Sequence, residues 1–320
     1  MKSMASAMLA FLLFGSALAP AAAQSFPSRA VRWIVPFPAG GATDALARPM
    51  ADRLATQWGH PVIVENRPGA NTAIGTDQVA KSAPDGHVLG MVTSALHINP
   101  LLGQNLPYDT LSDLTGVMQM TRLHMALYAR RDLEAGTPAE LVALARKQPG
   151  KLQYGSASPA AYLAMESLNM TAGVKMEYIP YKGSAPAITD LLGGRLALII
   201  DPVLSTTLQY VREGRLRLIA TLGAQRAELT PQTPVIGDAV PGFTYITLFG
   251  LVAQGKTPPD LVRRIRDDLA RVILSPDISA RIREIGQEPV ASTSEDYNAL
   301  IRSEMKRWEP VIKATGAKIN

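Results

Sequence analysis

Short β-rich segments alternate with helical segments along almost the whole chain beyond residue 25. In the helical segments, apolar residues recur at helical spacing, as at residues 43–58, where they recur every four residues. Strands that alternate with helices of about 10–15 residues predict parallel sheets covered by helices on both faces, and therefore an α/β fold. The β-rich segments are residues 31–37, 62–65, 88–92, 152–155, 176–180, 196–200, 216–221 and 245–253.

Two segments that we expect to be extended, residues 121–133 and 245–253, divide the chain. If both cross between lobes, residues 26–125 and 243–320 form lobe 1 and residues 126–242 form lobe 2. Such a topology predicts a cleft at the crossing, where strand ends and helix N-termini of both lobes meet.

The first 23 residues have the order of a secretory signal peptide. Lys2 is followed by an apolar run over residues 8–19 and by the small residues Ala21–Ala23. A membrane anchor is the alternative, but the run is shorter than the roughly 18 apolar residues of a spanning helix. We therefore expect residues 1–23 to be removed and the mature protein to be exported and soluble.

Composition excludes several classes of protein. The chain has no cysteine, which excludes disulfides, thiolate metal sites and cysteine nucleophiles, and its four histidines show no HxxxH spacing. We expect neither metal nor cofactor. The formal charge is +5, but the basic residues are dispersed, and the densest cluster, residues 263–283, is interleaved with acidic ones. That pattern favours a solvated helix face over nucleic-acid binding.

The loop over residues 36–44 joins a predicted strand to a predicted helix. Gly40 and Gly41 allow positive φ, and the following helix N-terminus favours a bound anion. Asp44 can cap free amides or accept a hydrogen bond from a ligand. A simple tight turn is the alternative, because the chain contains neither a P-loop nor GxGxxG.

Similar loops occur at residues 93–94, 155–158 and 181–186, where Ser184 is a predicted N-cap. Several helix starts of this kind predict a cleft that binds an anion mainly through neutral groups. Thr137 and Thr257, each followed by a proline, are also predicted N-caps.

Longer motifs extend this pattern: PFPAGGATD at residues 36–44, VENRPGA at 64–70, APDG at 83–86, NLPYD at 105–109, PYKGSAP at 180–186 and DLLGG at 190–194. With these motifs the chain resembles the Bug (TctC-like) family of periplasmic solute-binding receptors of the tripartite tricarboxylate transporter system. The resemblance extends from about residue 26 to the C-terminus.

The resemblance implies a type II periplasmic-binding-protein fold, in which two α/β lobes joined by two crossing segments close on a small organic carboxylate. It implies a monomer in the periplasm that delivers this ligand to integral-membrane transporter subunits, without catalysis and without binding nucleic acid. Carried over position by position, it implies ligand contacts from Phe37, Ala39, Gly40, Gly41, Thr43, Asp44, Thr93, Ser94, Gly155, Ser156, Lys182, Gly183, Ser184 and Asp201.

Some of these positions allow two interpretations. Lys182 can bind the ligand or form a surface ion pair, and Asp201 can contact the ligand or act as a buried cap. Relatives carry a longer loop after position 156 that ends in a histidine, where this chain has Tyr162. Tyr162 and Phe37 can stack on an aromatic acid or serve as packing residues, so the ligand's identity is not transferred from a relative.

Other functions are weaker alternatives. Ser156 and Ser184 lack a GxSxG elbow, which argues against a hydrolase, although Asp44 and Asp201 could pair across the cleft. A receptor that docks on a membrane sensor protein would show the same sequence features as a transport receptor.

Overall fold

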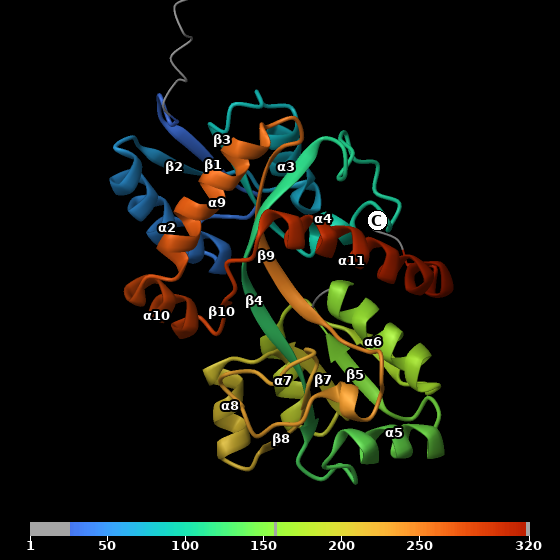
Figure 1. Cartoon of the computed structure of the whole chain (residues 1–320). Coiled ribbons are helices and arrows are strands. Elements are labelled where there is room, and N and C mark those ends of the chain that lie inside the picture. Colours follow the sequence, from blue (N-terminus) through green and yellow to red (C-terminus); the bar gives the residue numbers. More distant parts are fainter. Residues whose placement is uncertain (1–25, 157–158, 318–320) are drawn as a thin grey trace, which may run out of the picture.

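The structure, a computed structural model, describes residues 26–156 and 159–317. The predicted signal peptide, residues 1–23, lies outside these residues. The described chain is a mixed α/β molecule whose strands follow the path β2-β1-β3-β9-β4-β7-β5-β6, with β8 and β10 also paired to β4. Figure 1 shows an upper and a lower part joined in the middle by the long strands β4 and β9.

The strands are β1 (Val31–Val35), β2 (Val62–Asn66), β3 (Val88–Thr93), β4 (Leu114–Arg130), β5 (Gln153–Ser156), β6 (Glu177–Pro180), β7 (Leu198–Pro202), β8 (Leu216–Thr221), β9 (Ile246–Gln254) and β10 (Glu288–Pro289). The α-helices are α2 (Ala42–Trp58), α3 (Ala73–Ala80), α4 (Ala95–Ile98), α5 (Pro138–Lys147), α6 (Pro159–Ala172), α7 (Ser184–Leu192), α8 (Ser205–Arg212), α9 (Pro259–Ile273), α10 (Pro276–Glu284) and α11 (Ser294–Thr315). The described residues also form two short 3-10 helices, η1 (Ala70–Thr72) and η2 (Ile236–Asp238).

We call the part built on β1, β2, β3 and β10 lobe 1, and the part built on β5 to β8 lobe 2. In lobe 1, β1 pairs in parallel with β2 and β3, and α2 buries Leu46, Met50 and Leu54 in a core that includes Trp33. In lobe 2, β5 pairs in parallel with β6 and β7. The predicted α/β fold is thus confirmed.

The expectation that the sheets are parallel is wrong where the lobes meet. Strand β9 runs antiparallel to β3 and β4, and β4 runs antiparallel to β7 and β8. The physical reason is that β4 and β9 carry the chain between the lobes in opposite directions. Strand β4 also begins at Leu114, seven residues before the segment predicted to be extended.

Helix α11 is a further connection between the lobes. Its first half buries Tyr297 and Ile301 beside β3 and β9, whereas Trp308 and Val311 pack into the lobe 2 core with Tyr154. Figure 1 shows α11 lying across the junction. The residue boundaries expected for the two lobes remain a prediction.

Helix caps differ in how well the sequence predicts them. Thr137 forms the predicted N-cap of α5, within a capping box with Glu140. Thr257 does not cap α9, because the helix begins one residue later, with Pro258 as N-cap and Pro259 at the first position. The Thr257 hydroxyl instead donates to the Gln254 carbonyl at 2.7 Å.

Within the described residues, no helix is long and apolar enough to span a membrane.

Candidate ligand-binding site

A small cavity lies where strand-to-helix loops of lobe 1 meet the start of α6 in lobe 2. We call it the interlobe cavity; its volume is about 190 Å³. Hydroxyl, amide and apolar groups line it, and no charged side chain occurs among the lining residues that the structure describes. The lining residues are Phe37, Asn71, Thr72, Thr93, Ser94, Ala95, Ile98, Asn99, Leu102, Ala160, Tyr245 and Thr247.

Strand pairing places the hydroxyl groups of Thr93 and Ser94 in this cavity. Thr93 is the last residue of β3 and Ser94 follows it. Strand β3 pairs with β9 so that Thr93 lies opposite Phe249. The Ser94 hydroxyl accepts a hydrogen bond from the Leu248 amide at 3.1 Å, and the Thr93 hydroxyl accepts one from the Ala95 amide at 3.4 Å. Each hydroxyl retains its own proton to donate, which is the group that a bound oxyanion requires.

The cavity wall includes a left-handed segment that we did not predict from the sequence. Ala70, Asn71 and Thr72 have φ values of 43°, 48° and 77°, an unfavourable conformation for residues other than glycine. Asn99, which is 2% exposed, holds it in place. The Asn99 amide donates to the Asn71 carbonyl at 2.7 Å, and the Asn71 amide donates to the Asn99 side-chain oxygen at 2.8 Å. Backbone strain of this kind clusters at ligand-binding segments.

A signal for this segment was present in the sequence, because the motif at residues 64–70 ends directly before Asn71. Asparagine is also one of the residues that most readily adopts a left-handed conformation. The contribution of Asn99 has no comparable local signal, because it acts through a residue 28 positions away.

Asp44 stabilises the loop between β1 and α2. Its carboxylate accepts hydrogen bonds from Arg48 at 2.8 and 2.9 Å, from the Gly40 amide at 3.0 Å and from Asn66 at 3.0 Å. The Arg48 guanidinium in particular holds the pKa of Asp44 at about 2, against the opposing effect of burial. All these partners belong to the loop and its neighbours, so the observed contacts are of the capping kind.

The two glycines of the same loop behave differently. Gly40 has a φ of +81°, as predicted. Gly41 does not use the positive φ that a glycine allows: this residue is the N-cap of α2 and has an extended conformation with φ −82°. The N-cap position requires extended backbone, which any residue adopts. Ala39 is exposed and Thr43 is buried, and neither lines the interlobe cavity.

Ser184 and Asp201 line a separate, larger cavity of about 680 Å³ beside α7 and α8. The Ser184 hydroxyl donates to Asp201, and the Thr207 hydroxyl donates to the other carboxylate oxygen at 3.3 Å. Burial raises the pKa of Asp201 above its ordinary value of 3.8. Among the described contacts, those of Asp201 join helix starts of lobe 2, which agrees with its interpretation as a buried cap.

The remaining predicted residues of lobe 2 lie outside both cavities. A Cβ at Gly155 would lie 2.7 Å from Leu196, so close packing explains this glycine. Ser156 is buried. The ring of Tyr162 packs on Tyr178, with 4.6 Å between ring centroids. Lys182 is exposed and Gly183 is half-buried. The prediction that Ser184 is an N-cap is wrong, because Gly183 is the N-cap of α7 and Ser184 is the first residue of the helix.

Of the predicted residues, the structure therefore brings Phe37, Thr93 and Ser94 together in the interlobe cavity. The ligand role of every predicted residue remains a prediction. Tyr245 and Thr247, which also line the cavity, were predicted only as part of a crossing segment. No cluster of metal-binding side chains occurs within residues 26–156 and 159–317.

Comparison with known proteins identifies the family. Residues 46–317 match the model of the tripartite tricarboxylate transporter family receptor, TctC. The chain is 32% identical to the protein BugT of Bordetella pertussis over 314 residues, 97% of this chain and 96% of that protein.

Two solved structures are similar over nearly their whole length. An R. palustris protein with adipate is 32% identical and superposes with a TM-score of 0.72, over 92% of this chain and 100% of that one. A TctC solute-binding protein from Polaromonas with no ligand is 26% identical and superposes with a TM-score of 0.84, over 91% and 100%. These similarities confirm the predicted periplasmic-binding fold and the resemblance stated from the sequence motifs. The chain belongs to the TctC family of solute-binding receptors of tripartite tricarboxylate transporters.

Proposed function

We propose that this protein captures a small organic carboxylate in the interlobe cavity and delivers it, in the periplasm, to the membrane subunits of a tripartite tricarboxylate transporter. The observation that carries the proposal is the chemistry of that cavity. Hydroxyl and amide donors from three chain segments, residues 71–72, 93–99 and 245–247, converge there, and no carboxylate is among the described lining side chains.

Neutral donors suit a carboxylate ligand that must be both bound and released. Hydrogen bonds to an ionised group contribute about 1.5–3 kcal/mol each, more than bonds between neutral groups. Asn71, Asn99 and the hydroxyls of Thr93 and Ser94 can supply several such bonds, and no ion pair has to be broken on release. The adipate in the R. palustris relative is a ligand of this chemical class.

The cavity's size and lining restrict the ligand further. Its volume of about 190 Å³ lies below the roughly 300–1,000 Å³ typical of pockets for drug-sized molecules. Ile98, Leu102 and Ala160 add an apolar wall. We therefore expect a short aliphatic or small aromatic acid rather than a large conjugate.

We also propose that the described arrangement of the lobes is the ligand-free one. Its TM-score to the ligand-free Polaromonas structure is 0.84, against 0.72 to the adipate-containing structure, although the sequence identity to the former is lower. Ligand would then shift the lobes towards closure by binding the closed form more tightly.

Calorimetry with defined acids tests the function. We expect at least one of malate, adipate, citrate, glutamate and benzoate to bind with one site per chain and to be recovered unchanged. At about 100 times its dissociation constant, a bound acid should add about 2.7 kcal/mol to the free energy of unfolding. If none of the five acids binds or raises the melting temperature, the proposal is wrong.

A pair of isosteric variants tests the site. Thr93→Val removes a hydroxyl from the cavity and should weaken binding about tenfold, since a lost bond to a charged group costs about 1.5 kcal/mol or more. Thr171→Val makes the same change on the exposed face of α6, where the hydroxyl donates to the Ser167 carbonyl. It should bind as the wild type does. Equal affinities of the two variants would contradict the assignment of the cavity.

A further inference from the structure

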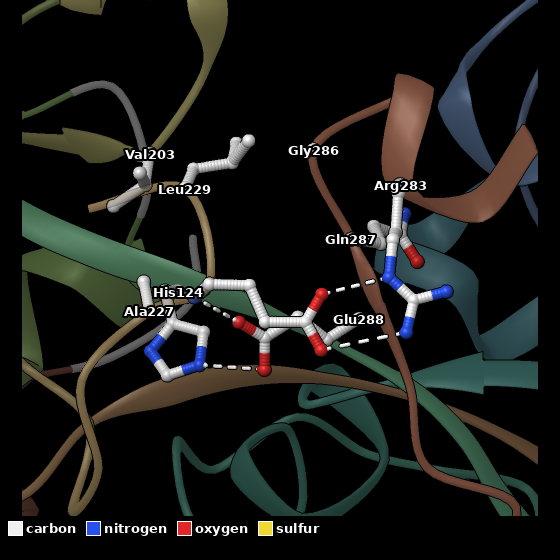
Figure 2. Close-up of a pocket in the computed structure, with 9 residues that line it drawn as sticks. His124, Val203, Ala227, Leu229, Arg283, Gly286, Gln287 and Glu288 are labelled. Carbon is white, nitrogen blue, oxygen red and sulfur yellow. Dashed lines mark hydrogen bonds and ion pairs between the residues drawn. The ribbon is translucent and has the colours of Figure 1, made fainter. Parts of the chain in front are cut away.

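A second cavity lies between the same two lobes, and we call it the rear cavity. Its volume is about 260 Å³, and it is lined by His124, Val203, Ala227, Glu228, Leu229, Arg283, Gly286, Gln287 and Glu288. Figure 2 shows Val203, Ala227 and Leu229 on one side of it and Arg283, Gly286 and Gln287 on the other. The first group belongs to lobe 2 and the second to α10 and the segment that leads into β10.

The rear cavity and the interlobe cavity lie on opposite faces of the ribbon formed by β4 and β9. Tyr245 and Thr247 line the interlobe cavity. Side chains alternate between the faces of a strand, so Ile246 between them points to the other face. Ile246 pairs with His124 of β4, and His124 lines the rear cavity. The ribbon that joins the lobes therefore separates the two cavities.

Polar contacts close the rear cavity from both lobes. Glu228, in the loop after β8, accepts a hydrogen bond from Arg283 Nε at 2.7 Å. The backbone amide of Glu228 donates to Glu288 Oε1 at 2.7 Å. We call Glu228, Arg283 and Glu288 the rear clasp, because these two contacts join lobe 2 to lobe 1 on the face away from the interlobe cavity.

The lobe 1 end of the rear clasp is firmly held. Glu288 Oε2 accepts hydrogen bonds from Arg122 Nε at 2.8 Å and from His124 Nε2 at 3.1 Å, both on β4. Burial alone would raise the pKa of Glu288, but the hydrogen bonds from His124, the Glu228 amide and Arg122 together hold it at about 2. Glu288 is therefore an ionised carboxylate held in place on lobe 1. The contacts that would break when the lobes move are those of Glu228, with Arg283 and with Glu288.

We propose that the rear clasp opposes closure of the lobes and thereby sets the affinity for ligand, so that Glu228 and Arg283 are affinity-determining residues although neither lines the interlobe cavity. This inference rests on the proposed function. A rotation about the β4–β9 ribbon that narrows the interlobe cavity widens the rear one and separates Glu228 from Arg283. The free energy of the lost contacts is subtracted from the free energy of ligand binding.

Two charge-matched variants test the proposal. Arg283→Gln removes the cross-lobe ion pair, and Arg281→Gln makes the same change in charge at an exposed position of the same helix. We expect Arg283→Gln to bind the acid found by calorimetry about two- to fivefold more tightly than wild type. This is the change in affinity that corresponds to the loss of one partly exposed ion pair. Arg281→Gln should bind as wild type does. Equal or weaker binding by Arg283→Gln would overturn the proposal.

A thermodynamic cycle identifies the pair as the cause. Glu228→Gln should also tighten binding, and the double variant should gain little beyond either single change, because both remove one contact. Fully additive gains would show that Glu228 and Arg283 act separately, and the clasp would be rejected.

A measurement without ligand separates this inference from the proposed function. Because the chain has no cysteine, Leu111→Cys in lobe 1 and Lys147→Cys in lobe 2 place one fluorophore on each lobe, both at exposed positions. Single-molecule energy transfer should show a closed population two- to fivefold larger in Arg283→Gln than in Arg281→Gln. If no acid binds, the proposed function fails while this comparison still tests the clasp. Equal closed populations in the two variants would overturn it.

Discussion

Acidification from about pH 7.5 to about pH 5 is expected to destabilise the protein through one buried histidine, His97 of α4. Its side chain is 3% exposed, and Nε2 lies 3.6 Å from Glu304 Oε2. Burial, together with the nearby Arg307 cation, lowers the pKa of His97 from 6.5 to about 4, although Glu304 acts in the opposite direction. The folded protein thus holds His97 neutral.

The sign and size of the effect follow from this shift. Because the pKa is lower in the folded state, the unfolded chain binds the proton first as the pH falls. The stabilisation is therefore complete above pH 6.5 and is lost as the pH falls towards about 4. Between about pH 7.5 and pH 5 this single group removes about 2 kcal/mol from the free energy of unfolding. The carboxylates of Asp44, Glu65 and Glu288 stay ionised throughout, because their pKa values are about 2.

Urea unfolding monitored by tryptophan fluorescence measures the effect. The free energy of unfolding is determined at both pH values for wild type, for His97→Gln and for the control His60→Gln, a histidine that is half-exposed. We expect the loss on acidification to be about 2 kcal/mol larger in wild type and in His60→Gln than in His97→Gln. The readout is the change with pH, so a lower overall stability of His97→Gln does not obscure it. If His97→Gln loses as much as wild type, the reasoning is refuted.

Three further predictions concern packing, the site and a helix cap. Gly250→Ala would place the new Cβ against the Tyr297 phenol ring and should lower the free energy of unfolding in urea by about 1–3 kcal/mol. Gly237→Ala is the control and should lower it less, because a Cβ there would lie 3.5 Å from the Phe243 carbonyl oxygen, an ordinary contact distance. Asn99→Leu removes the bonds that hold the left-handed segment and should weaken acid binding in calorimetry about tenfold; unchanged affinity would contradict the role given to that segment. Thr137→Ala removes the capping box of α5 and should cost about 1 kcal/mol in urea unfolding; no measurable loss would contradict it.

Local patterns in the sequence were sufficient for most elements. The four-residue repeat of Leu46, Met50 and Leu54 predicted α2, and Thr137 followed by a proline predicted the start of α5. The predicted loops at residues 36–44 and 93–94 supply Phe37, Thr93 and Ser94 of the interlobe cavity. These predictions succeed because the apolar periodicity of α2 and the capping box at Thr137 depend on neighbouring residues alone.

Tertiary structure decided which loops meet. The Leu248 amide bonds Ser94 across 154 positions of the chain, and Asn99 supports Asn71 across 28. The antiparallel direction of β4 and β9 and the division of their ribbon into two faces also come from strand pairing. Periodicity indicates that a segment is a strand and which side chains share a face, but the choice of partner strand depends on packing between residues distant in sequence. The sequence thus determined the elements and the anion-ready loops, whereas the interlobe cavity and the rear clasp exist only because distant segments pack against one another.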